Sequence, residues 1–488
     1  MSATAQGNVA TVAGHEVSTD HWIGGERVAS PERFDVITPI DGSVIAHVSA
    51  GGADEADRAV RAAAAAAAAW EERGAAGRAS LLHRLADLIA ENVEALAAVE
   101  CADMAMLLES LRLRVILRAA ANFRNYADLA VAYEERDWHS KGTWNRVQRM
   151  PAGPAAVITP WNAPFMLSTW KVAPALAAGC PVVLKPAEWS PLSCSLLADL
   201  TAEAGFPPGV FNVLQGIGEE AGAALVAHPL LRRVSFTGSP EAARQIGVAA
   251  ARNLVPFTGE LGGKGPLIVF EDADLKAAAA KAAGQYDDAG QVCLAGTRLL
   301  VAESVRDEFL ERFHAEVDKQ VLGDPRDPAT TISPLIHPDH LERVDGFVER
   351  AIAEGHELMR GGKRGEGLLY EPTLFAPSSG DAEIVQREVF GPVLTFQTFA
   401  GEDEAVSLAN STEYGLSGIV YTSSMGRADR IGRAVRAGIV WVNTFLVRDL
   451  TAPFGGVGIS GIGREGGNYA LDFYSDLKTL QILDGSVR

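Results

Sequence analysis

Three residues whose types suit nucleophilic catalysis stand beside glycine or proline in the sequence. Cys293 lies in GQVCLAGTR between Gly290 and Gly296, and its thiolate could act as a nucleophile. Glu260 precedes two glycines in TGELGGKGP and could act as a general base. Asn162 lies between two prolines in ITPWNAPF, so its amide could be held as a donor to an oxyanion. Taken singly, each also has an ordinary interpretation: a buried apolar thiol, a solvated loop acid and an Asx turn.

Two further segments have features of nucleotide-binding sites. Lys185 and Glu188 follow the strand-like run PVVLK, and ligands bind at the carboxyl ends of strands in open α/β sheets. An acid there can accept hydrogen bonds from ribose hydroxyls. In FTGSPEAARQIG, Ser239 is predicted to cap a helix that begins at Pro240, and such a helix start can hold a pyrophosphate. Neither segment is a GxGxxG motif, and neither is specific alone.

The elements that must position these residues alternate between strand and helix. Apolar runs of strand length occur at 155–159, 181–185, 210–214, 233–237 and 266–270, and helical patterns at 191–204, 219–227 and 240–251. The same alternation continues with a strand at 298–302, a helix at 305–318 and further strands up to 441–443. Strand and helix in turn predict parallel βαβ units, so the predicted fold class is α/β.

The remaining segments extend this plan. Helical patterns cover 54–102 and 106–134, and the alanines at 62–69 predict a helix packed closely against a neighbour. Residues 1–20 are small and polar, which predicts a loose arm. The segment 138–150 resembles an exposed hairpin. The tail at 477–483 alternates like a strand that pairs with another sheet edge, in this chain or in a partner subunit.

The length, charge and cysteine content of the chain indicate which partners and which cellular location to expect. The chain has 488 residues, of which 48% are hydrophobic, enough for two or three domains. Its net charge of −19 opposes binding to nucleic acid or to an anionic membrane. The four cysteines form no CxxC motif, so neither a disulfide framework nor a metal site is expected. No signal peptide or long apolar run is evident, and the expected location is cytoplasmic.

Seven segments, in order, resemble the aldehyde dehydrogenase superfamily over roughly residues 20–485: ITPWNAPF, VVLKPAE, SFTGS, ELGGK, GQVCLAGTR, EVFGPV and PFGGVGISGIGREGG. The resemblance implies a Rossmann-like cofactor domain, an α/β catalytic domain and a small β oligomerisation flap, with NAD as the cofactor and a homodimer or homotetramer as the assembly. Mapped onto this chain, the NAD-binding domain comprises residues 1–134 and 153–262, the catalytic domain residues 263–470, and the flap residues 135–152 and 471–488.

The resemblance also implies roles for individual residues. Cys293 attacks an aldehyde, Asn162 and the Cys293 backbone amide stabilise the thiohemiacetal oxyanion, and Glu260 activates the water that hydrolyses the resulting thioester. The residues expected to contact the cofactor are Trp161, Lys185, Glu188, Gly238, Ser239, Glu388 and Phe390. Glu188 favours NAD, because a carboxylate repels the 2′-phosphate of NADP.

The chain also departs from the family pattern, in segments that flank the reacting groups. Ala289 and Asp288 stand where asparagine and a small residue are commoner, and Gly265 stands where serine is common. These differences leave the reacting groups themselves intact.

Two arginines indicate which class of substrate to expect. The segments around Arg118 (LRAAANFRNYAD) and Arg448 (NTFLVRDLTAPFGG) resemble the branch that includes hydroxymuconic, aminomuconic and carboxymethyl-hydroxymuconic semialdehyde dehydrogenases. In that branch the matching arginines contact the substrate's carboxylate or a neighbouring oxygen, and an arginine fork suits a carboxylate. The implied substrate is a carboxylated semialdehyde from aromatic catabolism. A structural role stays open for both residues, with Arg118 on a helix face and Arg448 paired with Asp449.

Four other functions stay open at this point. They are a general aliphatic or aromatic aldehyde dehydrogenase, a CoA-acylating dehydrogenase, a non-catalytic dinucleotide-binding protein and a cysteine hydrolase. Glu260 argues against the CoA-acylating branch, which generally lacks this base. Intact Cys293, Glu260 and Asn162 argue against a non-catalytic protein, and no histidine lies near Cys293 in the sequence to serve a hydrolase.

Overall fold

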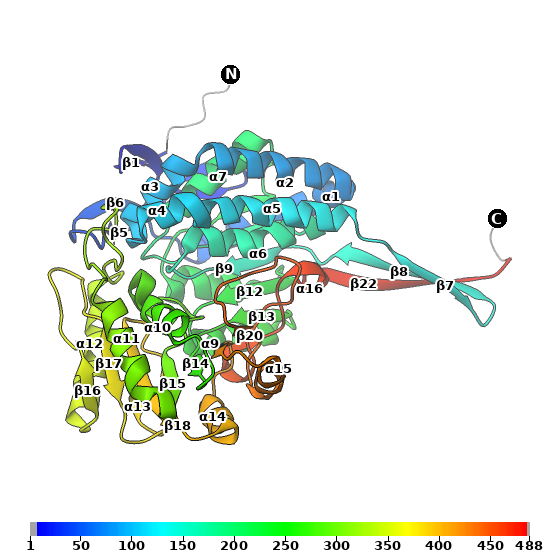
Figure 1. Ribbon diagram of the computed structural model, residues 1–488. Coiled ribbons are helices and arrows are strands. Elements are labelled where there is room, and N and C mark those ends of the chain that lie inside the picture. The colour runs from blue at the N-terminus through cyan, green and yellow to red at the C-terminus, as the bar shows by residue number, and fades with distance from the viewer. Residues whose placement is uncertain (1–6, 486–488) are drawn as a thin grey trace.

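Two mostly parallel β-sheets flanked by helices form the body of the molecule (Figure 1). The computed structural model describes residues 7–485. The first sheet has eight strands, in the order β21 (Gly461–Ile462), β13 (Phe257–Glu260), β12 (Arg233–Thr237), β9 (Ala155–Ile158), β10 (Val182–Lys185), β11 (Phe211–Val213), β3 (His21–Ile23) and β4 (Glu26–Val28). Its five central strands are parallel, whereas β21, β3 and β4 pair antiparallel at its edges.

The second sheet has seven strands, in the order β16 (Glu357–Arg360), β17 (Thr373–Ala376), β18 (Val393–Phe399), β15 (Arg298–Ala302), β14 (Pro266–Val269), β19 (Ser417–Tyr421) and β20 (Ile439–Val442). All of its pairings are parallel except that of β16 with β17. The two sheets confirm the predicted α/β class.

Helices on both faces explain why the central strands are buried along nearly their whole length. On β9, Ala155 and Val157 belong to the core that also contains helices α2 (Gly74–Glu91), α5 (Ile116–Val131), α6 (Pro164–Ala178) and α7 (Leu192–Ala204). Ala156 and Ile158 point to the opposite core, formed with α1 (Ala53–Glu72), α8 (Ala223–Val226) and α9 (Pro240–Arg252). The second sheet is likewise covered by α10 (Leu275–Ala283), α11 (Arg306–Val317) and α12 (Pro338–Ala353) on one face, and by α14 (Glu402–Ala409) and α15 (Met425–Ala434) on the other.

The helical segment predicted at 54–102 is three helices, α1, α2 and α3 (Val93–Met104). The break after α1 falls at Gly74, whose φ of +69° lies in the left-handed region. The predicted close packing of the alanine-rich helix is confirmed at Gly209, where a Cβ atom would lie 2.5 Å from the Ala62 carbonyl oxygen. The segment at 106–134 contains α4 (Leu108–Ser110), a π-helical turn, η1 (Leu111–Val115), and α5.

The prediction of a loose arm at residues 1–20 is wrong for its described part, residues 7–20; residues 1–6 lie outside the described chain. Strands β1 (Val9–Val12) and β2 (His15–Ser18) pair antiparallel. Val12 and Val17 are buried in a small core with residues of β5 (Arg33–Ile37) and β6 (Val44–Ser49). These strands are short, and their apolar partners come from later segments, so local composition gave only a weak signal.

The hairpin predicted near 138–150 is formed by β7 (Arg136–Ser140) and β8 (Thr143–Pro151). The tail strand β22 (Ser475–Leu483) follows helix α16 (Gly467–Phe473) and pairs antiparallel with β8 of the same chain, from Ser475 opposite Pro151 to Leu483 opposite Thr143. This three-stranded sheet extends away from the body of the molecule (Figure 1). Among the helices of residues 7–485, none combines the length and the apolar character that crossing a bilayer requires.

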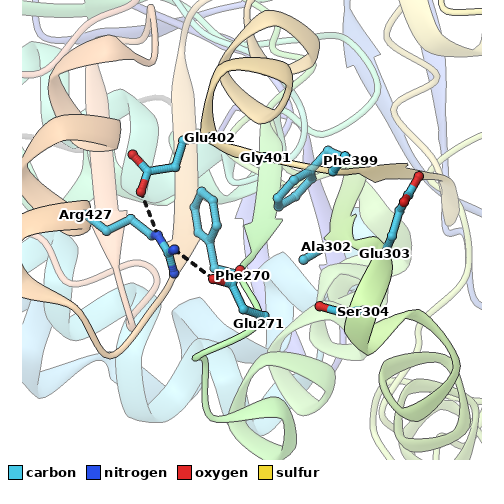
Figure 2. A pocket seen from close by; sticks show the side chains of 10 residues that line it. Phe270, Glu271, Ala302, Glu303, Ser304, Phe399, Gly401, Glu402 and Arg427 are labelled. Atoms are coloured by element: carbon cyan, nitrogen blue, oxygen red, sulfur yellow. Dashed lines mark hydrogen bonds and ion pairs between the residues drawn. The ribbon is translucent and has the colours of Figure 1, made fainter.

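A surface depression of about 590 Å³ lies where β14, β15 and β18 of the second sheet end (Figure 2). Arg427, the one cation among the described residues that line it, is already paired with two of its acids, donating to Glu271 at 2.8 Å and to Glu402 at 3.0 Å. None of the candidate catalytic or ligand-binding residues lines it. The candidate catalytic residues lie elsewhere: Asn162 and Glu260 at the carboxyl ends of first-sheet strands, and Cys293 before the amino end of β15 in the second sheet.

Candidate active site

One cavity of about 390 Å³ gathers residues that are far apart in the sequence. The candidate residues that line it are Arg118, Asn162, Glu260, Cys293 and Arg448. They come from a helix, two segments at the carboxyl edge of the first sheet, and two loops of the second half of the chain. The structure therefore brings all three candidate catalytic residues and both candidate substrate arginines to one place.

Cys293 lies on a tightly turned loop that leads into β15. Asp288, Ala289 and Gly290 all have left-handed φ values, of +52°, +53° and +69°. Any residue other than glycine at position 290 would clash, because a Cβ atom there would lie 2.2 Å from the Gly391 carbonyl oxygen. On the other side, a Cβ atom on Gly263 would lie 2.3 Å from the carbonyl oxygen of Cys293. Gly290 and Gly263 thus allow the close backbone approaches on the two sides of the Cys293 loop.

The environment of Cys293 keeps its thiol protonated at neutral pH. Burial, followed by the negative charges of Glu388 and Glu260, raises the pKa of Cys293 to about 12, while Arg448 opposes the shift. The thiolate is the nucleophilic form. A base must therefore take the proton when the thiol reacts.

Glu260 is the last residue of β13 and is buried, so its interpretation as a solvated loop acid is excluded. Neither carboxylate oxygen has a hydrogen-bond partner within residues 7–485. Burial, reinforced by the charge of Glu465, raises the pKa of Glu260 well above its usual range. A Cβ atom on Gly455 would lie 2.7 Å from Glu260 Oε1, so glycine at 455 leaves room for the carboxylate. A buried carboxyl group with a raised pKa and free lone pairs suits a general base.

Two donors are available for an oxyanion beside Cys293. Asn162 Nδ2 donates one hydrogen bond to the Gln291 carbonyl at 2.9 Å, which holds the amide against the Cys293 loop. Its second N–H remains for a ligand in the cavity that it lines. The Cys293 backbone N–H makes no hydrogen bond to another residue in the described chain.

Both arginines are held by aromatic rings rather than by acids. The Arg448 guanidinium lies 3.7 Å from the ring centre of Phe454 and 5.4 Å from that of Trp170. Arg118 lies 5.9 Å from the same Trp170 ring. The described residues form no ion pair with either arginine, and Asp449 accepts hydrogen bonds from Thr451 instead. Burial and the charge of Arg118 lower the pKa of Arg448 to about 10. Two clustered guanidiniums without a counter-ion favour an anionic ligand.

Sequence reasoning missed a buried ion pair behind the cavity. Lys171 Nζ donates to Glu465 Oε1 and, at 3.1 Å, to Ser235 Oγ. Glu465 lines the cavity, and its charge is one cause of the raised pKa of Glu260. A signal existed, because Lys171 is the only charged residue of the apolar helix α6. Trp170, the ring shared by the two arginines, was also missed, because no local pattern indicated this role.

The residues expected to contact the adenosine end of a dinucleotide lie where β10 and β12 end. Lys185 Nζ donates to Glu188 Oε2 at 2.9 Å, and the Glu188 side chain is 30% exposed, which leaves an oxygen for ribose hydroxyls. Ser239 caps α9 as predicted, accepting from the Ala242 N–H at 3.1 Å. Gly238 lies beside this cap and donates its N–H to the Glu260 carbonyl at 3.1 Å. An oriented acid and an open helix start at the ends of two strands that flank β9 on either side fit a dinucleotide.

The remaining expected contacts bring this region next to Cys293. Glu388 Oε1 accepts from the Gly263 N–H at 2.8 Å, and a Cβ atom on Gly262 would lie 2.0 Å from Glu388 Oε2. Burial raises the pKa of Glu388 to about 7. The rings of Trp161 and Phe390 meet edge to face, with centres 5.2 Å apart. The segment that carries Glu388 and the loop that carries Cys293 therefore both pack against the backbone at Gly262 and Gly263.

Comparisons with known proteins agree with this arrangement. A model of the aldehyde dehydrogenase family matches residues 26–480. The 2-hydroxymuconic semialdehyde dehydrogenase of Pseudomonas sp. (strain CF600) is 41% identical over 478 residues, covering 94% of this chain and 98% of that protein. The 2-aminomuconic semialdehyde dehydrogenase of Danio rerio is 38% identical over 476 residues, covering 95% of this chain and 98% of that protein. The crystal structure of Staphylococcus aureus betaine aldehyde dehydrogenase in complex with NAD+ superposes with a TM-score of 0.94 at 37% identity, covering 97% of this chain and 96% of that one.

Proposed function

The chain belongs to the aldehyde dehydrogenase family, and on that premise we propose that the cavity around Cys293 is its active site. The chain is an NAD-dependent enzyme that oxidises an aldehyde to a carboxylate. The observation that carries the proposal is that Cys293, Glu260 and Asn162, from three separate segments, line one cavity.

In the proposed mechanism, Glu260 accepts the thiol proton of Cys293, and Sγ forms a bond to the aldehyde carbon. The carbonyl electrons move to oxygen, where Asn162 Nδ2 and the Cys293 N–H donate to the oxyanion. Bound NAD supplies the acceptor for the hydride that the thiohemiacetal loses. Glu260 then releases the thiol proton to solvent, so that it can act as a base a second time. Water attacks the thioester left on Cys293 and gives a proton to Glu260, and the carbon–sulfur bond breaks as this proton returns to Sγ; the acid product leaves as the carboxylate after losing its remaining proton to solvent.

Residues already oriented in the structure would hold the cofactor. We assign the adenosine ribose to Lys185 and Glu188, the pyrophosphate to Gly238 and Ser239, and the nicotinamide half to Trp161, Glu388 and Phe390. The Glu188 carboxylate disfavours the 2′-phosphate of NADP, because two anions would be forced together. The unpartnered Glu260 in the cavity favours hydrolysis of the thioester over its transfer to CoA.

For the substrate we propose a semialdehyde that carries a distal carboxylate. Arg118 and Arg448 support this, because their guanidiniums share one aromatic platform and lack acid partners in the described chain. Two relatives named above act, by their names, on 2-hydroxymuconic and 2-aminomuconic semialdehydes. The alternative, a general aliphatic or aromatic aldehyde dehydrogenase, would gain nothing from this pair of cations.

Arg448→Met tests the substrate class. Methionine keeps apolar contact with Phe454 but removes the charged fork, so kcat/KM for adipic semialdehyde should fall about 10- to 100-fold. Hexanal lacks the carboxylate, so its kcat/KM should change less than about threefold. Both are measured by NADH absorbance.

Arg112→Met is the matched control, because it makes the same replacement at an arginine that pairs with Glu94 and does not line the cavity. It should leave both substrates unaffected. Equal losses for adipic semialdehyde and hexanal in Arg448→Met would contradict the substrate assignment and favour a general aldehyde dehydrogenase.

We also propose the domain division implied by the resemblance: residues 1–134 and 153–262 bind NAD, residues 263–470 form the catalytic domain, and residues 135–152 and 471–488 form the flap. The separate sheets support this division, although β21 of the catalytic segment pairs with β13 of the first sheet. A cytoplasmic location is proposed because all four cysteines are free thiols.

A homodimer or homotetramer is proposed through the flap. Leu477 and Leu480 of β22 are 67% and 39% exposed, on a sheet that extends from the body (Figure 1). The double variant Leu477→Lys, Leu480→Lys should therefore reduce the mass measured by light scattering to that of a smaller assembly. Met425→Lys, at a residue 84% exposed on α15, is the control and should not change it. A native chain that is monomeric at micromolar concentration would contradict the proposal.

A further inference from the structure

Asp288 is a carboxylate in the active-site cavity that the mechanism does not use. It lies on the loop before Cys293 and lines the same cavity as Arg118 and Arg448, whereas its neighbour Asp287 does not. Three acidic residues line this cavity. Glu260 is the proposed base and Glu465 pairs with Lys171, which leaves Asp288 without a role.

The Asp288 carboxylate has no hydrogen bond or ion pair with any residue from 7 to 485. Partial burial raises its pKa, and the one charge that stabilises its ionised form is Arg114. Arg114 lies one helical turn before Arg118 and also lines the cavity. Asp288 therefore shares one cavity with Arg118 and Arg448, and the cation that stabilises its ionised form, Arg114, lies on the same side of the helical segment as Arg118.

The backbone around Asp288 fixes where its side chain can be. Asp288 is left-handed, with a φ of +52°. Its carbonyl accepts from the Gln291 backbone N–H at 3.1 Å and from Gln291 Nε2 at 3.2 Å. Gln291 is held in turn, because its Oε1 accepts from the Ile336 N–H at 3.0 Å. A hydrogen-bond acceptor on a loop held by these hydrogen bonds is preorganised for a ligand.

We propose that Asp288 is a specificity-determining residue that accepts a hydrogen bond from a hydroxyl or amine on the carbon next to the substrate's distal carboxylate. This inference rests on the proposed function, in which the arginines bind that carboxylate. Guanidinium groups only donate, so they cannot accept from a hydroxyl or amine, whereas a carboxylate only accepts. A substrate without the donor leaves Asp288 unsatisfied beside a second anion, so the site discriminates against it.

The test compares adipic semialdehyde with its α-hydroxy derivative, with hexanal as a reference without a carboxylate. The native enzyme should favour the α-hydroxy derivative by about tenfold in kcat/KM. Asp288→Ala removes the acceptor and should bring the ratio close to one. Asp288→Asn keeps a neutral acceptor and tolerates left-handed backbone, so its ratio should be intermediate.

Asp287→Asn is the matched control, because this adjacent acid does not line the cavity, and it should keep the native ratio. Hexanal turnover in all three variants should match the native enzyme, which shows that the Cys293 loop is intact. An unchanged ratio in both Asp288 variants overturns the proposal. An equal gain for both acids in Asp288→Asn also overturns it, because Asp288 would then act only as a repelling charge. A native enzyme that prefers neither acid over hexanal refutes the proposed substrate class instead.

Discussion

Protein carrying Cys293→Ala is expected to bind NAD and fold normally, yet to form NADH at least about 10⁴-fold more slowly than the native chain. Alanine removes the only atom in the cavity proposed to form a covalent bond with the aldehyde. Without the thiohemiacetal, the aldehyde carbon carries no oxyanion to expel the hydride from that carbon. The rate is measured by absorbance of NADH with adipic semialdehyde, and NAD binding by quenching of tryptophan fluorescence.

Cys194→Ala is the matched control for this result. Cys194 is a buried thiol on α7, and burial raises its pKa as it does for Cys293, but it does not line the cavity. Its replacement should leave the rate within about threefold of the native value, since it changes only packing and weak sulfur hydrogen bonds to Ser168 and Pro164. A native rate in Cys293→Ala would refute the covalent mechanism, and equal losses in the two variants would point to a folding defect.

The sequence predicted most of the first sheet because its strands are buried on both faces. β9 and β10 are short, mainly apolar runs (AAVI and VVLK), and their length distinguishes them from the longer apolar helix α6 between them. β12 (RVSFT) is equally buried although it includes Arg233 and Ser235. The small N-terminal strands lacked this signal, because β1 and β2 pack against segments further along the chain. Non-local contacts of this kind cannot be read from local composition.

The candidate site was predictable where backbone geometry demands glycine. Gly262, Gly263 and Gly290 each occupy positions where a Cβ atom would collide with the backbone or side chain of another segment. Such collisions explain why glycines flank Glu260 and Cys293. The element that carries Glu260 was less evident, since it ends a strand rather than lying in a loop. The sequence did not predict the ion pair between Lys171 and Glu465, because no local pattern links two residues so far apart in the chain.

The two sheets use opposite ends to build one site. In the first sheet, the candidate residues follow the carboxyl ends of strands, as open α/β sheets predict. In the second, Cys293 and Glu388 precede the amino ends of β15 and β18. The carboxyl end of the second sheet holds the depression in which Arg427 is paired with Glu271 and Glu402 (Figure 2). Applying the usual rule to both sheets would have located the site at that depression.

Glu260→Gln should separate the two halves of the reaction. Glutamine keeps the shape of the side chain but cannot take a proton from water, so hydrolysis of the thioester should slow by about 10²- to 10⁴-fold. Formation of the thioester should suffer less. The negative charge of Glu260 raises the pKa of Cys293, and its removal makes the thiol easier to ionise to solvent. Rapid mixing should therefore show a burst of about one NADH per active site, followed by a slow steady rate.

The pH dependence of the steady rate also tests whether Glu260 is the base for hydrolysis. Burial raises the pKa of Glu260 well above its usual range, and the active base is the ionised form. The native steady rate should therefore rise with pH as Glu260 loses its proton, and this rise should vanish in Glu260→Gln. Glu100→Gln is the control, because burial also raises the pKa of Glu100, to about 7, yet Glu100 accepts from the Phe165 N–H and does not line the cavity. If the burst is absent in Glu260→Gln, or if Glu100→Gln removes the rise, Glu260 is not the base for hydrolysis.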